Sequence, residues 1–316
     1  MESSNSNAQY ESQDRSDFEF ALDNGFLWLT RIVGFGVAAI LIWIIIQITL
    51  QAVPAIQQFG ARFITQSAWN PIDQTYGVLP MVYGTIVSSI FALLLAVPIA
   101  IGCAIILSEN FFPRSVQRVF VFAIELLAAI PSVVYGLWGI YILIPFLRGI
   151  GSWIHNYFGW IPLFSTQPIG PGMFPAGVIL SIMILPIITA ISRDSLVSLP
   201  PELRGASYAV GSTRWQTIFS VLIPAAFSGI IGGVMLGLGR ALGETMAVTM
   251  VIGNSNNLNI SIFAPGNTIA SLIASQFPEA DDLQRSALMY AALILFATTL
   301  IVNVLAEWIV NRVKKY

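Results

Sequence analysis

Six apolar stretches, each long enough to cross about 30 Å of hydrocarbon, constrain this chain more than any other feature. Charged residues make up only 9% of the sequence, whereas a soluble domain has about 25%. Within lipid the backbone must satisfy its own hydrogen bonds, which a helix does. The sequence therefore predicts an all-α, polytopic membrane protein with six transmembrane helices. The stretches are 27–51, 77–107, 119–146, 174–192, 219–252 and 286–311.

The distribution of lysine and arginine predicts the orientation of these helices. With the N-terminus inside, ten of the 14 basic residues fall in cytoplasmic segments, and Arg62, Arg148 and Arg285 fall in long outer loops. The remaining one, Arg240, lies in the membrane. We therefore expect a multi-pass membrane protein with both termini in the cytoplasm.

Composition divides the chain into three parts. Residues 1–24 are polar and acidic and have too few apolar side chains to form a core, so we expect a disordered cytoplasmic tail. Residues 25–74 hold the first transmembrane helix and an outer loop, and residues 75–313 hold a core of five transmembrane helices.

Two opposite charges, Arg240 and Glu244, lie within the fifth stretch. A charge at the bilayer centre costs roughly 2.5–3.5 kcal/mol even on insertion scales, so both need a reason. At about 100° per residue they share one arc of roughly 160° with the glycines of 229–243. Aliphatic residues such as Ile230 and Leu242 occupy the opposite arc. We expect the aliphatic arc to face lipid and the glycine arc to meet another helix or an aqueous path.

Two interpretations of this charged pair follow. In the first, Arg240 supplies a positive charge for an anion near mid-membrane, and Glu244, one turn away, holds and neutralises the guanidinium when no anion is present. In the second, the two residues form an ion pair that serves packing alone.

The third stretch repeats the pattern with a single acid. Glu125 lies within roughly 100° of the small residues Ser132 and Gly136 on a helical wheel. Pro131 frees a backbone carbonyl, which is tolerated where protein or water can satisfy it. Glu125 is either part of a substrate path, where we place it with Arg240 and Glu244, or a neutral residue in a helix contact.

The cytoplasmic segment between the fourth and fifth stretches contains a short helix-forming sequence at about 200–211. Pro201 suits a first helical turn, and Gly211 suits a helix end. A short helix outside the bilayer with small residues on one side is either a docking element for a soluble partner or an ordinary connector.

Several catalytic and metal-binding motifs are missing from the sequence. The only lysines are Lys314 and Lys315, so no P-loop exists, and no Gly-x-Ser-x-Gly elbow is present. His155 is the only histidine and Cys103 the only cysteine, which leaves no catalytic triad and no cysteine metal site. We expect no enzyme activity, cofactor or metal in this chain, and the energy for transport must come from a gradient or another subunit.

The cytoplasmic segment resembles the signature of permeases in binding-protein-dependent ABC importers, which reads Glu-Ala-Ala, three residues, Gly, nine residues, Ile-x-Leu-Pro. The spacing is kept here, in Gly205-Ala206-Ser207, Gly211 and Val221-Leu222-Ile223-Pro224. The chain departs from the signature at Gly205, where the family usually has Glu, and at Ser207, where it has Ala. Glu202 and Arg204 are the candidates to replace the missing acid.

Two further runs, 125–139 and 237–248, are similar to the permease subunits of phosphate-specific ABC importers, in the type I (MetI-like) permease family. The resemblance covers about 75–313 and implies a subunit of the bacterial inner membrane that moves inorganic phosphate into the cytoplasm. It implies as partners a second homologous permease, two ATPase subunits that bind ATP, and an extracytoplasmic phosphate-binding protein. It also implies that Arg240 and Glu244 act in phosphate passage. The expected ATPase contacts are Glu202, Arg204, Gly205, Ala206, Ser207 and Gly211.

Other functions stay open at the level of sequence. One arginine does not distinguish phosphate from sulfate or molybdate. In a gradient-driven transporter or channel the pair Arg240 and Glu244 would relay ions, but inverted half-repeats are absent and the signature segment counts against this class. A membrane scaffold without a pathway leaves the charged pair unexplained.

Overall fold

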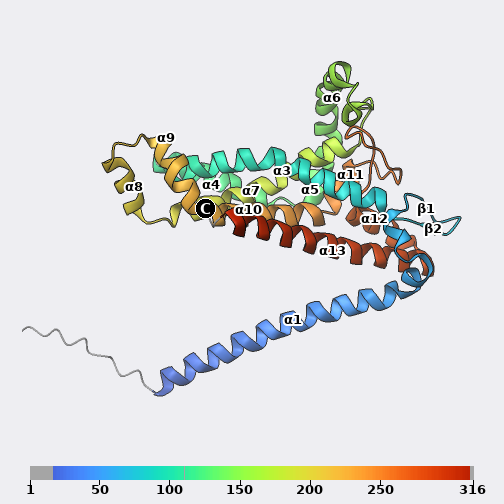
Figure 1. Cartoon of the computed structure of the whole chain (residues 1–316), viewed down its shortest axis with the longest axis horizontal. Coiled ribbons are helices and arrows are strands. Elements are labelled where there is room, and N and C mark those ends of the chain that lie inside the picture. Colours follow the sequence, from blue (N-terminus) through green and yellow to red (C-terminus); the bar gives the residue numbers. More distant parts are fainter. Residues whose placement is uncertain (1–16, 110, 314–316) are drawn as a thin grey trace, which may run out of the picture. The chain divides into compact units, whose positions relative to one another are not determined.

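The computed structural model describes residues 17–109 and 111–313, and its contacts divide the chain into two compact units, 1–50 and 51–316 (Figure 1). Helix α1 (Asp17–Phe59) runs from the first unit into the second. Of the expected disordered tail, residues 1–16 lie outside the described residues, whereas 17–24 are helical because α1 begins at Asp17. In the first unit most side chains from 24 to 50 are apolar and exposed, as in a helix surrounded by lipid.

Six helices in the described part of the chain are long and apolar enough to cross a membrane, which confirms a six-span helical protein. The third differs from the expected range, since the apolar helix covers 132–158 instead of 119–146. The fifth ends at Gly243, well before the expected residue 252. The six are 24–59, 79–108, 132–158, 173–197, 214–243 and 282–308.

The core of the second unit consists of α3 (Leu79–Ser108), α7 (Met173–Val197) and α10 (Ile223–Gly243), with α7 packed against both of the others. Every fourth residue on one side of α3 is an alanine with no exposed surface: Ala92, Ala96, Ala100 and Ala104. A row of small side chains lets two helices approach closely, which is how helices associate in lipid. The row is visible in the sequence, although the sequence analysis did not use it.

The expected continuous helix over 119–146 is interrupted, so that prediction is wrong in detail. Helix α4 (Arg114–Ala129) ends before Ile130, whose ψ of 126° is extended, and α5 (Ser132–Trp138) starts after Pro131. Proline disfavours helical geometry in the residue before it and has no N–H to donate. The π-helical turn η1 (Gly139–Leu143) and α6 (Ile144–Phe158) follow.

The two halves of this segment lie along the core. Helix α4 packs on α7, and α5 packs on α11 (Met246–Val251), whereas α6 projects from the bundle (Figure 1). The short 3-10 turn η2 (Pro162–Phe164) then leads toward α7.

Short elements cover one end of the bundle, where the sequence places outer loops. They are α2 (Arg62–Thr65), an antiparallel hairpin of β1 (Trp69–Asn70) and β2 (Thr75–Tyr76), α12 (Ile269–Gln276) and the 3-10 turn η4 (Phe277–Glu279). Phe63 stacks on Tyr290 of α13 (Asp282–Val313) with ring centroids 4.5 Å apart. This aromatic cluster joins the hairpin to the last helix.

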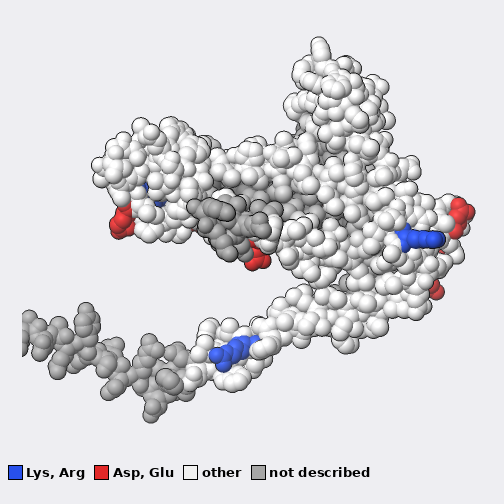
Figure 2. Space-filling model, viewed as in Figure 1, with Lys and Arg blue, Asp and Glu red and all other residues white. Residues whose placement is uncertain are grey.

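Another group of short helices lies at the opposite end of the bundle (Figure 1). It contains α8 (Pro201–Ala209), α9 (Arg214–Thr217) and the π-helical turn η3 (Ile218–Leu222), which leads directly into α10. Figure 2 shows that most charged atoms visible on the second unit lie near its two ends, with largely uncharged surface between them. This arrangement suits a helical bundle whose middle is embedded in lipid.

The packing of α3 against the outer segment gives a stability test with a matched control on the same helix. A Cβ added at Gly84 would collide with the Asn267 carbonyl, whereas one at Gly102 meets nothing within 4 Å. We expect Gly84→Ala to destabilise the folded protein by about 1–3 kcal/mol through overpacking. We expect Gly102→Ala to be neutral or to stabilise it by up to about 1 kcal/mol, because alanine favours helix over glycine. Thermal unfolding in detergent measures both, and equal behaviour of the two variants would contradict the packing described.

Candidate functional site

The glycines of α10 form two rows with different surroundings. One row packs on α7: a Cβ added at Gly233 would lie 3.1 Å from Ile191, and one at Gly237 would lie 2.8 Å from Ile188. Gly229 similarly abuts Ser195. The other row has open space where its Cβ atoms would stand, and it consists of Gly232, Gly239 and Gly243. The sequence predicts a single arc of glycines, but the structure divides it into two edges of α10. The closed edge packs on α7, and the open edge has free space beside its glycines.

The aliphatic arc of α10 is buried inside the protein, so the expectation that it faces lipid is wrong. Ile230, Leu238 and Leu242 are each less than a tenth exposed, as is Val248 in the following helix. The reason is that α10 is surrounded by α7, α3 and α13. Its exposed edge is the one with the open glycines and Arg240.

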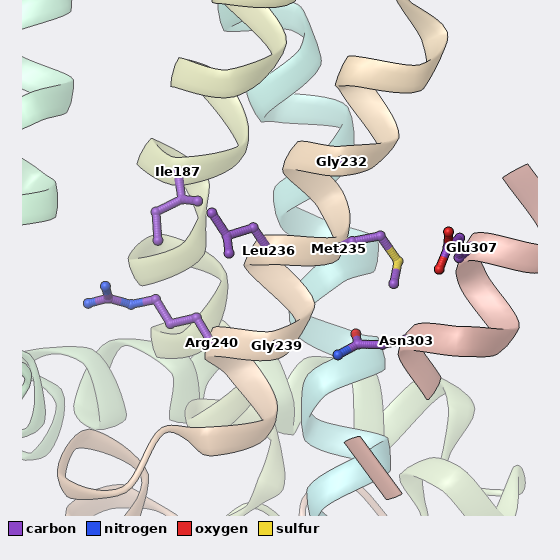
Figure 3. Close-up of a pocket in the computed structure, with 8 residues that line it drawn as sticks. All are labelled: Ile187, Gly232, Met235, Leu236, Gly239, Arg240, Asn303 and Glu307. Carbon is purple, nitrogen blue, oxygen red and sulfur yellow. The ribbon is translucent and has the colours of Figure 1, made fainter. Parts of the chain in front are cut away.

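Arg240 lies at an open pocket of about 740 Å³ formed by α7, α10 and α13. Figure 3 shows its guanidinium extending away from α13, which carries Asn303 and Glu307. The guanidinium of Arg240 is therefore not directed toward the acid on α13.

Glu244 does not pair with Arg240 in this conformation. Within the described residues no ion pair joins the two, because α10 ends at Gly243 and the backbone of Glu244 is extended, with a ψ of 125°. Its carboxylate instead accepts a weak hydrogen bond of 3.4 Å from the Ala247 amide at the start of α11. The buried intrahelical pair expected from the sequence is therefore absent, and Arg240 is exposed.

Glu125 lies in a second open groove, of about 630 Å³, between α4 and α7. The polar face of α4 contributes Glu125, Arg114 and Arg118 to this groove, and α7 contributes Arg193. The Arg193 Nε is buried and has no partner among the described residues, while its terminal nitrogen lies 3.5 Å from Asp194. The arrangement leaves an excess of positive charge around a donor that is not satisfied, which suits an oxyanion.

The basic character of this groove was not predicted from the sequence. The signal was present, since positions 114, 118 and 125 fall within about 40° of one another on a helical wheel. Arg193 comes from another helix, so its proximity to this face depends on tertiary packing.

The structure forms the short helix α8 where the cytoplasmic signature lies. It ends in a Schellman motif, with Gly211 at a φ of +84°, the Gly211 amide bonded to Tyr208 and the Ser212 amide bonded to Ser207. The buried Ser207 hydroxyl lies 2.9 Å from that of Thr217, which ties α8 to α9.

The remaining predicted contact residues of α8 differ in exposure. The exposed ones are Glu202, Gly205, Ala206 and Gly211. A side chain at Gly205 would meet nothing within 4 Å, so the acid that the signature usually has there would point into open space. Arg204 is turned inward, toward Glu109 at the end of α3. Their role in contacting an ATPase stays a prediction.

Two open pockets with arginines on membrane-spanning helices, together with a helix outside the bundle between two spans, indicate a membrane transport subunit. Residues 96–315 match the family described as "Binding-protein-dependent transport system inner membrane component". The chain therefore belongs to this family, and its relatives place it among the PstC permeases within that family.

Curated relatives and solved structures support this assignment. The chain is 45% identical over 262 residues to the "Phosphate transport system permease protein PstC" of Pasteurella multocida, covering 81% of this chain and 82% of that protein. It is 42% identical over 309 residues to the protein of the same name in Mesorhizobium japonicum, covering 96% of this chain and 94% of that protein.

The fold is that of a type I ABC importer permease. A crystal structure of a bacterial alginate ABC transporter aligns with a TM-score of 0.61 at 16% identity, covering 93% of this chain and 97% of that chain. An inward-facing structure of the MetNI methionine ABC transporter aligns with a TM-score of 0.51 at 17% identity, covering 75% and 94%.

The exposure of Arg240 predicts that position 240 contacts water within the membrane. In the Cys103→Ser background, we expect Arg240→Cys to react with a charged, water-soluble thiol reagent at least about tenfold faster than Leu242→Cys, because thiolate forms in water and not in an apolar core. Leu242 is 2% exposed and two residues away, which makes it a matched control. Labelling followed by mass spectrometry of the assembled complex measures both rates. Equal rates would place Arg240 away from any aqueous path.

Proposed function

We propose that this chain is the permease subunit of an ATP-driven ABC importer that moves inorganic phosphate into the cytoplasm. The observation that carries the proposal is an exposed arginine, free of any acidic partner among the described residues, on the open small-residue edge of a membrane span. A permanent cation there is costly unless it meets water or an anion. The names of the relatives support phosphate as that anion.

In this proposal the anion contacts two groups of arginines in sequence. Arg240 on α10 takes it near the middle of the membrane through charge-assisted hydrogen bonds from the planar guanidinium. The α4–α7 groove then receives it, with Arg193 as the donor nearest the core and Arg114 and Arg118 toward the start of α4. Glu125 reduces the net charge of the groove, so that the anion is released instead of being trapped.

We also propose that Glu244 regulates the charge of Arg240. Its carboxylate follows the last turn of α10 and caps α11 through the Ala247 amide. Since that bond is weak, at 3.4 Å, the carboxylate can leave it and approach the guanidinium when the anion has passed. This would neutralise Arg240 between transport events.

The partners follow from the same proposal. A second, homologous permease (PstA-like) would complete the path along the open edge of α10, and an extracytoplasmic phosphate-binding protein (PstS-like) would deliver the substrate. Two ATPase subunits (PstB-like) would bind the ATP, for which this chain has no P-loop, and would dock on α8. Both termini then lie in the cytoplasm, on the same side of the inner membrane as α8.

The transport role of the arginines can be tested with two charge-removing variants. We expect Arg240→Gln to abolish phosphate uptake, because the anion loses its counter-charge where water is scarcest. We expect Arg193→Gln to slow uptake about tenfold, in line with about 1.4 kcal/mol for one charge-assisted hydrogen bond. Uptake of labelled phosphate into proteoliposomes with the partner subunits measures both, and co-purification with the ATPase shows that each variant assembles.

The same proteoliposomes separate phosphate from other oxyanions. Labelled sulfate or molybdate, each offered with its own binding protein, should not be imported through the wild-type chain. Normal uptake by Arg240→Gln would instead make this residue structural, and sulfate import in place of phosphate would overturn the substrate assignment.

The end of α8 gives a separate test of ATPase coupling. A β-branched residue at Gly211 would have to adopt a positive φ, which costs roughly 1–2 kcal/mol, and would distort the Schellman motif. We expect Gly211→Val to hydrolyse ATP without proportionate uptake, and Gly211→Asn to remain coupled because asparagine tolerates this conformation. The ratio of phosphate imported to ATP hydrolysed is the measurement. Unchanged coupling in Gly211→Val would remove α8 as the coupling helix.

A further inference from the structure

A buried ion pair joins α8 to the end of α3. The Arg204 Nε and terminal nitrogen lie 3.1 Å and 3.0 Å from one carboxylate oxygen of Glu109. The Glu109 side chain is 8% exposed and that of Arg204 22% exposed. The other side-chain ion pair described above, between Arg193 and Asp194, is longer at 3.5 Å, and its acid is 74% exposed. The Arg204–Glu109 pair is thus shielded from water and salt in a way that the second pair is not.

Arg204 also binds the end of α7. Its terminal nitrogens donate to the Leu196 carbonyl at 2.9 Å and to the Leu199 carbonyl at 3.3 Å. These carbonyls belong to the last turn of α7 and the segment after it, where no helical amide follows to bond them. One guanidinium, carried by α8, therefore binds a side chain at the end of α3 and backbone carbonyls at the end of α7.

Two covalent connections join α8 to the bundle, and the first, residues 198–200, comes from the end of α7. After α8 the chain passes through the left-handed Gly211, the capping box of Thr213 and Gln216, α9 and the π-helical turn η3 before it becomes α10. It therefore leads to α10 and not to α3. Turns and π-helical segments are also points where a helix can bend.

We propose that Arg204 and Glu109 form a clamp that transmits movement of α8 to the α3–α7 pair during ATP-driven transport. This inference rests on the proposed coupling role of α8. The chain carries the movement to α7 through residues 198–200 and to α10 through α9, and the clamp carries it to α3. Arg204 acts as a positioning residue that faces inward, whereas its neighbour at position 205 faces outward, where the partner docks.

The clamp is tested with Glu109→Gln, which keeps the shape of the side chain and removes its charge. We expect ATPase binding and basal ATP hydrolysis to persist, while the phosphate imported per ATP falls by roughly 5- to 150-fold, the range of coupling between sites. Arg204→Lys keeps the charge but loses the fork of donors, and we expect an intermediate loss. Asp282→Asn removes an exposed acid at the opposite end of the bundle and should retain the wild-type ratio.

A distance measurement reports on the clamp without depending on the substrate. Spin labels at Ile106 on α3 and Tyr208 on α8, both exposed, can be introduced into the Cys103→Ser background. We expect the distance distribution to broaden in Glu109→Gln and to stay narrow in Asp282→Asn. In contrast, Ser207→Ala removes the contact with Thr217 and should leave the distance between α8 and α3 unchanged.

The outcomes separate this inference from the proposed function. If Arg240→Gln imported phosphate normally, the substrate path would be wrong, but the distance between α3 and α8 would still decide the clamp. If Glu109→Gln lowered uptake and ATP hydrolysis in equal proportion, with an unchanged distance distribution, the pair would be structural only and the clamp would be overturned. Should Glu109→Gln not fold, Arg204→Lys alone gives the same comparison.

Discussion

The close approach of α3, α7 and α10 through small side chains is the contact on which the rest of the structure depends. Lipid chains are as apolar as leucine, so helices in a membrane gain little from hydrophobic burial and associate where their surfaces fit. Here the alanine row of α3 and the row Gly229, Gly233 and Gly237 of α10 provide that fit. Because one row of α10 is committed to α7, the other row is left at the open edge, and Arg240 lies within it.

The position of Arg240 follows from this packing and from the end of α10. A guanidinium on the closed edge would have to displace Ile188 or Ile191 of α7. On the open edge it needs no protein partner if water or a second subunit lies beside it. The helix then ends at Gly243, which moves Glu244 off the helical path and prevents the pair that a continuous helix would form. Local backbone geometry thus decides whether the arginine is neutralised.

The spans and the helix outside the bilayer could be predicted because they depend on length, composition and turn residues. Pro201 and Gly211 lie at the two ends of α8, as helix-start and helix-end preferences require. Which side of α10 faces lipid could not be predicted this way. Ile230 and Leu242 are buried by neighbouring helices, whose positions cannot be read from the sequence of α10 alone. Likewise Glu109 and Arg204 are 95 positions apart, and nothing in their local sequences links them. The helix break at Pro131 could have been predicted from the sequence, but the apolar residues on both sides of the proline suggested one continuous span.

Three connections of α8 lead to the three core helices. Residues 198–200 join α8 to α7, the chain through η3 joins it to α10, and the Arg204–Glu109 clamp joins it to α3, so movement of α8 reaches both surfaces that meet at the closed glycine row. Packed helix surfaces change by discrete sliding or rotation and not by gradual deformation. A buried ion pair suits one of these connections, because its geometry is fixed by several hydrogen bonds, whereas an apolar contact between α8 and α3 could slide. The same movement would reposition the open edge of α10 relative to the arginines of the α4–α7 groove, as the proposed passage of an anion from Arg240 to Arg193 requires.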